Sequence, residues 1–191
     1  MNESIKFPYY SGNIRFIKSL GLISLEDFIR VHRSPKPNIK ALLDQIKTCE
    51  NKQEKRKLKH GLYSFTPSVI INKGNKRKLS DVVEYTGLMQ IDFDCIPDKE
   101  TAEDLKQWVF EQDETVCSYF SPSGGVKALI RIAKPQNLKH YKRMHLAVAE
   151  KYNVTSYFDV ATKNCVLPLF ISFDEQILSR DYSAAIAWKN E

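Results

Sequence analysis

The alternation of strand and helix patterns between residues 88 and 173 constrains the fold of this 191-residue chain more than any other feature. Short β-rich segments bounded by turn residues alternate with longer segments whose apolar residues repeat at helical spacing. The predicted order is strand 88–94, helix 99–112, strand 115–120, strand 126–133, helix 138–152 and strand 166–173. A β-α-β-β-α-β order of this kind predicts an α+β core of the ferredoxin-like or RRM-like type.

The chain before this core predicts a helical and β extension packed on it. Ser24 can cap a short helix, with Asp27 at its third position. Asn38 can cap a second helix, which is expected to continue through Lys57, and short strands are expected around Pro67. The predicted division is therefore an extension over residues 1–80, a core over 81–180, and a tail or the start of a linker over 181–191.

The charge of the chain is +6, from 29 basic and 23 acidic residues, and the excess is concentrated in two clusters. The candidate nucleic-acid-binding residues in these clusters are Lys55, Arg56, Lys57, Lys76, Arg77 and Lys78. Basic clusters near a carboxylate pair suit a polyanion that must approach a metal. The alternative is a solvated helix face and the tip of a turn.

Several classes of protein are disfavoured by what the sequence lacks. No apolar run reaches membrane-spanning length and no signal-peptide segment opens the chain, so we expect a cytoplasmic protein without a membrane partner. The four cysteines are far apart and are expected to be reduced thiols. The GxxxxGK[ST] pattern of P-loop ATPases is absent.

The first predicted strand ends in Asp92 and Asp94, which are separated by Phe93. Residues two apart on a strand point to the same face of the sheet, so the two carboxylates should lie side by side. Adjacent carboxylates repel unless a cation lies between them. Mg²⁺ and Mn²⁺ prefer such oxygen ligands, so the pair indicates a metal site. The alternative is a solvated strand end that leads into a turn.

Three separate segments would meet at the end of this strand. In the ferredoxin-like topology the first strand lies between the third and the fourth and is antiparallel to both. Its end would then lie beside the start of each of them. The residues at these places are Ser121, Ser123, Gly124, Gly125 and Lys127 before and in the third strand, and Asp159 before the fourth.

Each of these residue types has a use in binding a metal and a phosphate. Three carboxylates can hold one or two hard cations and leave coordination positions for phosphates. Lys127 can pair with a triphosphate as a point charge. A Ser-Gly-Gly turn offers backbone N–H groups to an anion. Taken singly, the turn can equally be a plain hairpin and Asp159 a turn residue.

Five short segments follow one another in a recognisable order: FTPS at 65–68, YTGL at 85–88, IDFD at 91–94, SPSGGVK at 121–127 and FISFD at 170–174. This set resembles the archaeo-eukaryotic primase superfamily. More narrowly, residues 58–175 are similar to the primase-like domain at the N-terminus of virulence-associated protein E-type replication proteins of Bacteroidetes and their mobile elements. The resemblance rests on the ordered set, because each segment alone is common.

The resemblance implies a template-directed nucleotidyltransferase, a DNA primase or polymerase domain of a replication protein, with Mg²⁺ or Mn²⁺ as cofactor. Asp92 and Asp94 match the first metal-binding motif and Asp159 the third, while Ser123 and Lys127 match the nucleotide-phosphate motif. The implied partners are a single-stranded DNA template, nucleoside triphosphates and a helicase module, either fused or separate.

Two positions depart from the superfamily pattern. Other branches place a histidine where the nearest residue here is Lys127, and an acid and an arginine are expected where this chain has residues 164–168, NCVLP. The second hypothesis is therefore a catalytically degenerate primase-like module that binds single-stranded nucleic acid. Rolling-circle nickases and nucleotide cyclases are disfavoured, because the chain has no His-x-His pair and no GGDEF-like segment.

Overall fold

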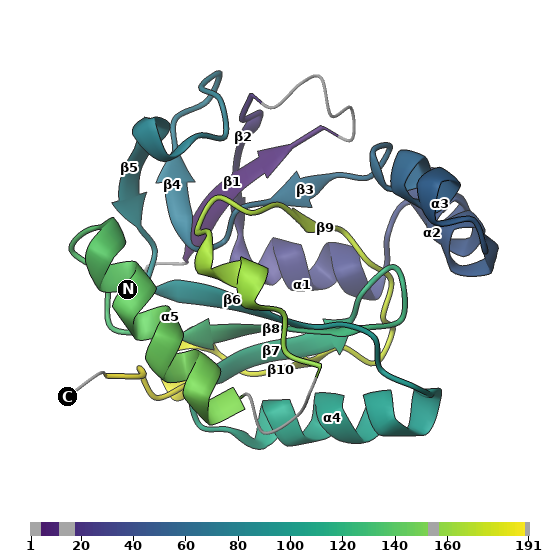
Figure 1. The fold of residues 1–191 in the computed structure, drawn as a ribbon. Coiled ribbons are helices and arrows are strands. Elements are labelled where there is room, and N and C mark those ends of the chain that lie inside the picture. Colours follow the sequence, from purple (N-terminus) through teal and green to yellow (C-terminus); the bar gives the residue numbers. More distant parts are fainter. Residues whose placement is uncertain (1–4, 12–17, 153–156, 190–191) are drawn as a thin grey trace.

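The computed structural model describes residues 5–11, 18–152 and 157–189 (Figure 1). The α-helices of this described part are α1 (Leu25–Arg33), α2 (Pro37–Thr48), α3 (Lys52–Lys59), α4 (Lys99–Glu111) and α5 (Leu138–Tyr152). Its strands are β1 (Lys6–Tyr10), β2 (Gly21–Ser24), β3 (Ser64–Phe65), β4 (Val69–Ile71), β5 (Val82–Tyr85), β6 (Leu88–Phe93), β7 (Thr115–Phe120), β8 (Val126–Arg131), β9 (Leu169–Phe170) and β10 (Leu178–Ser179).

The described strands form three sheets, and every pairing between named strands is antiparallel. One sheet has the order β2-β1-β3-β9, a second has the order β10-β7-β8-β6, and β4 pairs with β5 alone. The segregated antiparallel sheets and helices confirm the predicted α+β class.

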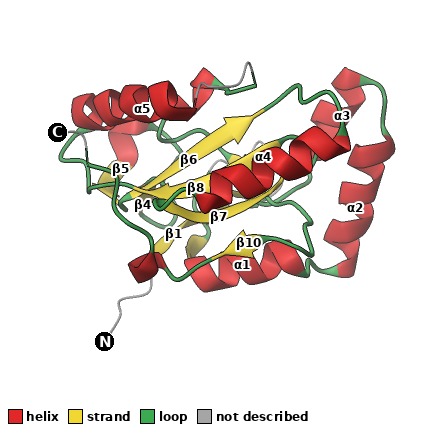
Figure 2. Ribbon diagram, turned by 90° about the horizontal axis from the view of Figure 1, so that it is seen from below, coloured by secondary structure: helices red, strands yellow, loops and turns green. Residues whose placement is uncertain are grey.

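The β10-β7-β8-β6 sheet is covered on both faces because its strands alternate apolar residues to either side. Met89, Ile91 and Phe93 of β6 pack with α4 and α5 in one core cluster. Figure 2 shows these two helices across the same face of the sheet. Leu88 of β6 belongs to a second cluster, which includes Phe28 of α1 and residues of α2, β1 and β3. The sheet therefore lies between the helical pair and the N-terminal elements.

Capping side chains and a proline determine where the three N-terminal helices begin. The Ser24 side chain accepts a hydrogen bond from the Asp27 amide and caps α1, as predicted. The second helix begins two residues earlier than the predicted cap at Asn38 implies, because Pro37 suits a first helical position, where no N–H partner is needed. It also does not continue through Lys57. Asn51 accepts hydrogen bonds from two amides and starts a separate helix, α3.

The predicted last strand, 166–173, is wrong in both length and position. Only Leu169–Phe170 forms a strand, and this strand, β9, pairs with β3 in the N-terminal sheet. Pro168 has no amide hydrogen to donate to a ladder. The segment after it is held elsewhere, since the Ser172 hydroxyl donates to the Phe120 carbonyl. The position beside the end of β6 is taken by residues 157–159, through a bridge between Phe93 and Phe158.

The residues after 180 lie against the end of β8. The Trp188 amide donates to the Arg131 carbonyl, and the Arg131 guanidinium donates to the Ala185 carbonyl at 2.8 Å. The division of the chain at residues 80 and 180 stays a prediction. None of the helices in the described part of the chain combines the length and apolar composition that a membrane-spanning segment requires.

Candidate metal centre

The register of the central sheet places Tyr119, Lys127 and Asp92 in one row. Asp92 of β6 lies opposite Lys127 of β8, which lies opposite Tyr119 of β7. Residues paired in this way point to the same face of the sheet. The row therefore lies on the face that does not carry α4 and α5.

Asp159 is brought to this row by backbone hydrogen bonds. Its amide donates to the Asp92 carbonyl at 2.8 Å, and the Asp94 amide donates to the Tyr157 carbonyl at 2.9 Å. One carboxylate oxygen from each of Asp92, Asp94 and Asp159 can be chosen so that the three lie within 4.8 Å of one another. The predicted convergence of three acids is thus present, although the segment that supplies Asp159 is not followed by the predicted strand.

Asp92 is the buried member of the group. Burial raises the pKa of its carboxyl, Lys127 opposes the rise, and the neighbouring Asp94 and Asp159 add to it. The Lys127 ammonium forms an ion pair with Asp92 Oδ2. Asp92 Oδ1 is buried and has no hydrogen-bond partner among the described residues. A buried carboxylate oxygen of this kind needs a cation or a donor.

The other two acids are more accessible. Asp94 is exposed, and Asp159 is half-buried and caps the short 3₁₀ helix η2 (Val160–Lys163) by accepting from the Ala161 amide. The Thr162 hydroxyl donates to the Asp159 carbonyl at 2.8 Å and lies 2.9 Å from His145 Nε2. His145 is buried behind this segment, where it supports the backbone of Asp159.

The Ser121–Gly125 turn packs directly against the acids. A Cβ atom added at Gly125 would lie 2.4 Å from the Phe93 carbonyl oxygen and 2.9 Å from Asp94 Oδ1. Gly124 has a φ of +92°, a conformation that favours glycine. Both glycines of the turn are therefore required by its geometry, one by close approach and the other by its backbone conformation.

The backbone N–H groups of this turn are used within it. The Gly125 amide donates to Ser121 Oγ at 3.0 Å, the Gly124 amide to the Ser121 carbonyl at 3.1 Å, and the Ser121 amide to the Gly125 carbonyl at 2.7 Å. The Ser121 side chain folds back into the turn, so the amides of Ser121, Gly124 and Gly125 are engaged here within the turn, and anion binding by the turn stays a prediction.

Lys59 is a site residue that the sequence did not single out within its basic cluster. From the last position of α3 its ammonium donates to Ser123 Oγ at 3.1 Å. Burial lowers the pKa of Lys59, Lys127 lowers it further, and Asp94 and Asp92 oppose this. The run of lysines reveals a helix with a positive face, but it does not reveal which lysine turns inward.

The two basic clusters lie on different sides of the molecule. Arg56 and Lys57 are exposed on α3, and Lys55 is half-buried there. Lys76, Arg77 and Lys78 lie in the loop between β4 and β5, which Figure 1 shows at the top of the view, away from α3. Arg77 is packed over the ring of Tyr10, with 5.9 Å from its guanidinium carbon to the ring centroid. Only the α3 cluster adjoins the acids, through Lys59.

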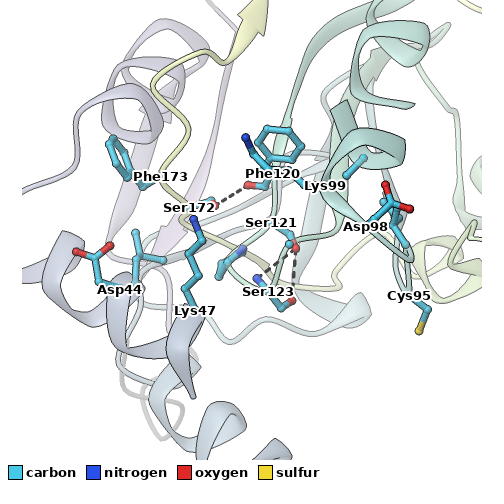
Figure 3. Close-up of a pocket in the computed structure, with 15 residues that line it drawn as sticks. Asp44, Lys47, Cys95, Asp98, Lys99, Phe120, Ser121, Ser123, Ser172 and Phe173 are labelled. Carbon is cyan, nitrogen blue, oxygen red and sulfur yellow. Dashed lines mark hydrogen bonds between the residues drawn. The ribbon is translucent and has the colours of Figure 1, made fainter. Parts of the chain in front are cut away.

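A cavity of about 520 Å³ lies on the other side of the same turn. Figure 3 shows Ser121 and Ser123 at its wall, with Phe120 and Phe173 on one side and Asp98 of the α4 start on the other. None of the three clustered acids lines this cavity. The turn therefore separates the acid cluster from a partly apolar hollow.

Comparison with known families gives one match. The family described as BT4734-like, N-terminal domain, matches residues 57–178, which is more than half of the chain. No curated protein and no solved structure matches. The matched region contains Lys59, the Ser121–Gly125 turn, Lys127 and the three clustered acids. The chain therefore belongs to the family of BT4734-like N-terminal domains.

Proposed function

We propose that this domain is a metal-dependent nucleotidyltransferase of the DNA primase-polymerase type. The observation that carries the proposal is the cluster formed by Asp92, Asp94 and Asp159, with Lys127 beside it. Carboxylates that can hold a metal ion and a lysine that can face a phosphate are recurring parts of sites for phosphoryl transfer.

The residues of the cluster fit a hard divalent cation. All three supply carboxylate oxygens, the ligands that Mg²⁺ and Mn²⁺ prefer. Asp92 Oδ1 is buried without a hydrogen-bond partner among the described residues, and a bound cation would compensate for its lost hydration. When bound, such a cation supplies positive charge that stabilises the transferring phosphoryl group. Asp92, Asp94 and Asp159 would hold it.

The protein's own residues position the anionic substrate. Lys127 carries a positive charge at the edge of the cluster, and the Ser123 hydroxyl lies on the turn that packs against Asp94. The exposed basic residues of α3 suit the phosphates of a single-stranded DNA template. Nucleoside triphosphates are the proposed substrates, and a helicase module, fused or separate, is a proposed partner in a cytoplasmic replication protein.

The order of elements supports an RRM-like core of the primase-polymerase type. β6, α4, β7, β8 and α5 follow one another, and β8 lies between β7 and β6 in the sheet. These are the first five elements of a β-α-β-β-α-β unit. The sixth differs, since residues 157–159 occupy the place beside the end of β6. This partial match, together with the ordered motifs, is the basis for proposing kinship with the primase superfamily and the virulence-associated protein E-type domains.

Primer synthesis and extension on a single-stranded template, with Mg²⁺ or Mn²⁺, tests the proposal. Asp94→Asn removes a carboxylate charge from an exposed side chain, so the fold should survive. We expect a loss of product formation of about 100-fold or more, as for other transition-state charge stabilisers. Asp104→Asn, on the exposed face of α4, is the matched control and should behave as the wild type. Equal product from wild type and Asp94→Asn would reject catalysis at this cluster.

A second function, binding of single-stranded nucleic acid without turnover, is favoured by the ion pair between Lys127 and Asp92. In this ion pair the Lys127 ammonium supplies Asp92 with the positive charge that a metal ion would otherwise provide. This hypothesis predicts DNA binding in EDTA with strong salt dependence. Replacing Lys55, Arg56 and Lys57 by Gln should reduce the log–log salt slope by about 2, from about 0.7 per phosphate contact.

The matched control for the α3 variant replaces three exposed basic residues of α5, Lys139, Lys142 and Arg143, by Gln. It removes the same formal charge from exposed positions on a different helix. Equal effects of the two triple variants would indicate non-specific attraction and would remove the argument for a track along α3.

A further inference from the structure

Two lysines from different elements approach the same turn and acids. Lys59 reaches Ser123 Oγ from the end of α3, and Lys127 pairs with Asp92 from β8. Lys127 lies close enough to Lys59 to help lower the pKa of the Lys59 ammonium. The fold thus places two like charges side by side, an arrangement that an anion between them would stabilise.

Lys59 differs from Lys127 in what it contacts. Within the described residues it forms no ion pair, and Ser123 Oγ is the hydrogen-bond acceptor found for its ammonium. An ammonium has three hydrogen atoms to donate. Lys59 is also partly withdrawn from solvent, whereas its neighbour Lys57 on the same helix is exposed. An anionic ligand would stabilise a partly buried ammonium whose other hydrogen atoms have no acceptor among the residues that the structure describes.

The charges of the site decide which ligand suits it. Three carboxylates face two ammonium groups, so a bare polyphosphate would meet a slightly negative site. One divalent cation on the carboxylates makes the same site net positive. The lysines, the Ser123 hydroxyl and a cation held by the acids would then surround a compact, highly charged anion.

We propose that Lys59, together with Ser123 and Lys127, forms the binding subsite for the terminal phosphates of a nucleoside triphosphate. This inference rests on the proposed function and names the residues that would contact the negatively charged phosphates of the substrate. A triphosphate is favoured over the backbone of a DNA strand, because the exposed lysines of α3 lie outside the turn and Lys59 lies against it.

Binding of inorganic tripolyphosphate, measured by calorimetry in EDTA and again with Mg²⁺, tests the subsite on the full chain. We expect binding to be weaker in EDTA than with Mg²⁺, because the site is net negative without the cation, and we expect Lys59→Gln to weaken the binding measured with Mg²⁺ by about tenfold or more, the effect of losing one charge-assisted hydrogen bond. Lys57→Gln removes the same charge from the same helix and should change affinity less than about twofold. Lys59→Arg should recover part of the loss. Because α3 contributes no buried residue to the core, thermal unfolding of these variants should match the wild type.

A single-stranded oligonucleotide provides the second arm, since its phosphates are diesters. Lys57→Gln should weaken oligonucleotide binding at least as much as Lys59→Gln does. With Mg²⁺ present, equal effects of the two variants on tripolyphosphate, no tripolyphosphate binding by the wild type at millimolar concentration, or a Lys59 effect confined to the oligonucleotide would each overturn the subsite. Primer synthesis does not enter these readouts. A specific effect of Lys59→Gln on tripolyphosphate binding, without primer synthesis by the wild type, would support the subsite and contradict the proposed enzyme activity. Primer synthesis without that effect would support the enzyme activity and contradict the subsite.

Discussion

At the scale of single residues, the close approach of Gly125 to the end of β6 sets the geometry of the acid cluster. The Phe93 carbonyl lies where a side chain at position 125 would begin, 2.4 Å from an added Cβ. Real Cβ atoms do not approach a carbonyl oxygen this closely, so a side chain at position 125 must push the turn away from the end of β6 and from Asp94. The hairpin turn is thereby tied to the position of one of the three carboxylates.

Gly125→Ala should destabilise the protein by about 2 kcal/mol and weaken divalent-cation binding, because the turn and Asp94 must separate. Gly74→Ala is a useful comparison, since nothing lies within 4 Å of its added Cβ but its φ is +84°. It should cost about 1 kcal/mol through the backbone alone and leave cation binding unchanged. Urea unfolding and Mn²⁺ titration measure both quantities. Cation binding by Gly125→Ala at wild-type strength would show that the contact does not position Asp94.

The acids were predictable at this scale, and Lys59 was not. Asp92 and Asp94 share a face because strand side chains alternate, and this follows from their spacing alone. Their approach to Asp159 was expected from a fourth strand beside the first, and the approach is present although residues 157–159 take the place of that strand. Lys59, by contrast, is one of several lysines in a helix without a buried residue. Its direction depends on how α3 packs near the turn, which spacing does not encode.

At the scale of elements, a buried ion pair joins α4 to the segment after β9. The Lys106 ammonium donates to Asp174 Oδ2 at 2.8 Å and to the Gln176 carbonyl at 2.9 Å. Asp174 Oδ2 also accepts from the Phe120 amide at 3.0 Å, at the entrance to the Ser121–Gly125 turn. The pair therefore fixes the end of β7 against the chain that returns from the N-terminal sheet.

Lys106→Met should destabilise the protein by about 3–5 kcal/mol, because it leaves the Asp174 carboxylate buried without its cation. The side chains of this pair are 7% and 5% exposed, whereas those of the Lys40–Asp44 pair on α2 are 48% and 59% exposed. Lys40→Met should therefore cost less than about 1 kcal/mol. Urea unfolding compares the two variants. Similar losses would mean that burial of the pair does not govern its contribution.

Element prediction succeeded where patterns were long and failed where tertiary contacts decided. The helices at 99–112 and 138–152 and the first three core strands appear close to their predicted bounds. The apolar run around Leu169 predicts a core strand, but its backbone pairs with β3 and the Ser172 hydroxyl donates to the Phe120 carbonyl at the end of β7. A short apolar segment can join either the core sheet or the N-terminal sheet. Pro168 argues only against a strand that begins before residue 169.

At the scale of the whole molecule, two buried histidines couple stability to pH. Burial lowers the pKa of His32 to about 4, and burial with the nearby Lys163 lowers that of His145 to about 4. An unfolded histidine titrates near 6.5. Between these two values the unfolded chain binds protons that the folded chain does not, so stability falls as the pH falls.

We expect the free energy of unfolding to decrease as the pH is lowered from 6.5 to 4, by a term on the order of 3 kcal/mol for each histidine. His32→Gln should lower the overall stability but reduce the slope of that decrease by about one proton. Urea unfolding at a series of pH values gives both slopes. Identical slopes for wild type and variant would show that His32 does not titrate with folding.

The central claim concerns the whole molecule, because segments about 65 residues apart must together create one cation site. Mn²⁺ binding, followed by electron paramagnetic resonance, tests it without reference to any reaction. The account predicts saturable binding by the wild type and by Asp104→Asn, and binding weakened about tenfold or more in Asp94→Asn through loss of one ligand charge. Binding by Asp94→Asn at wild-type strength, or no saturable binding by the wild type at millimolar Mn²⁺, would contradict it.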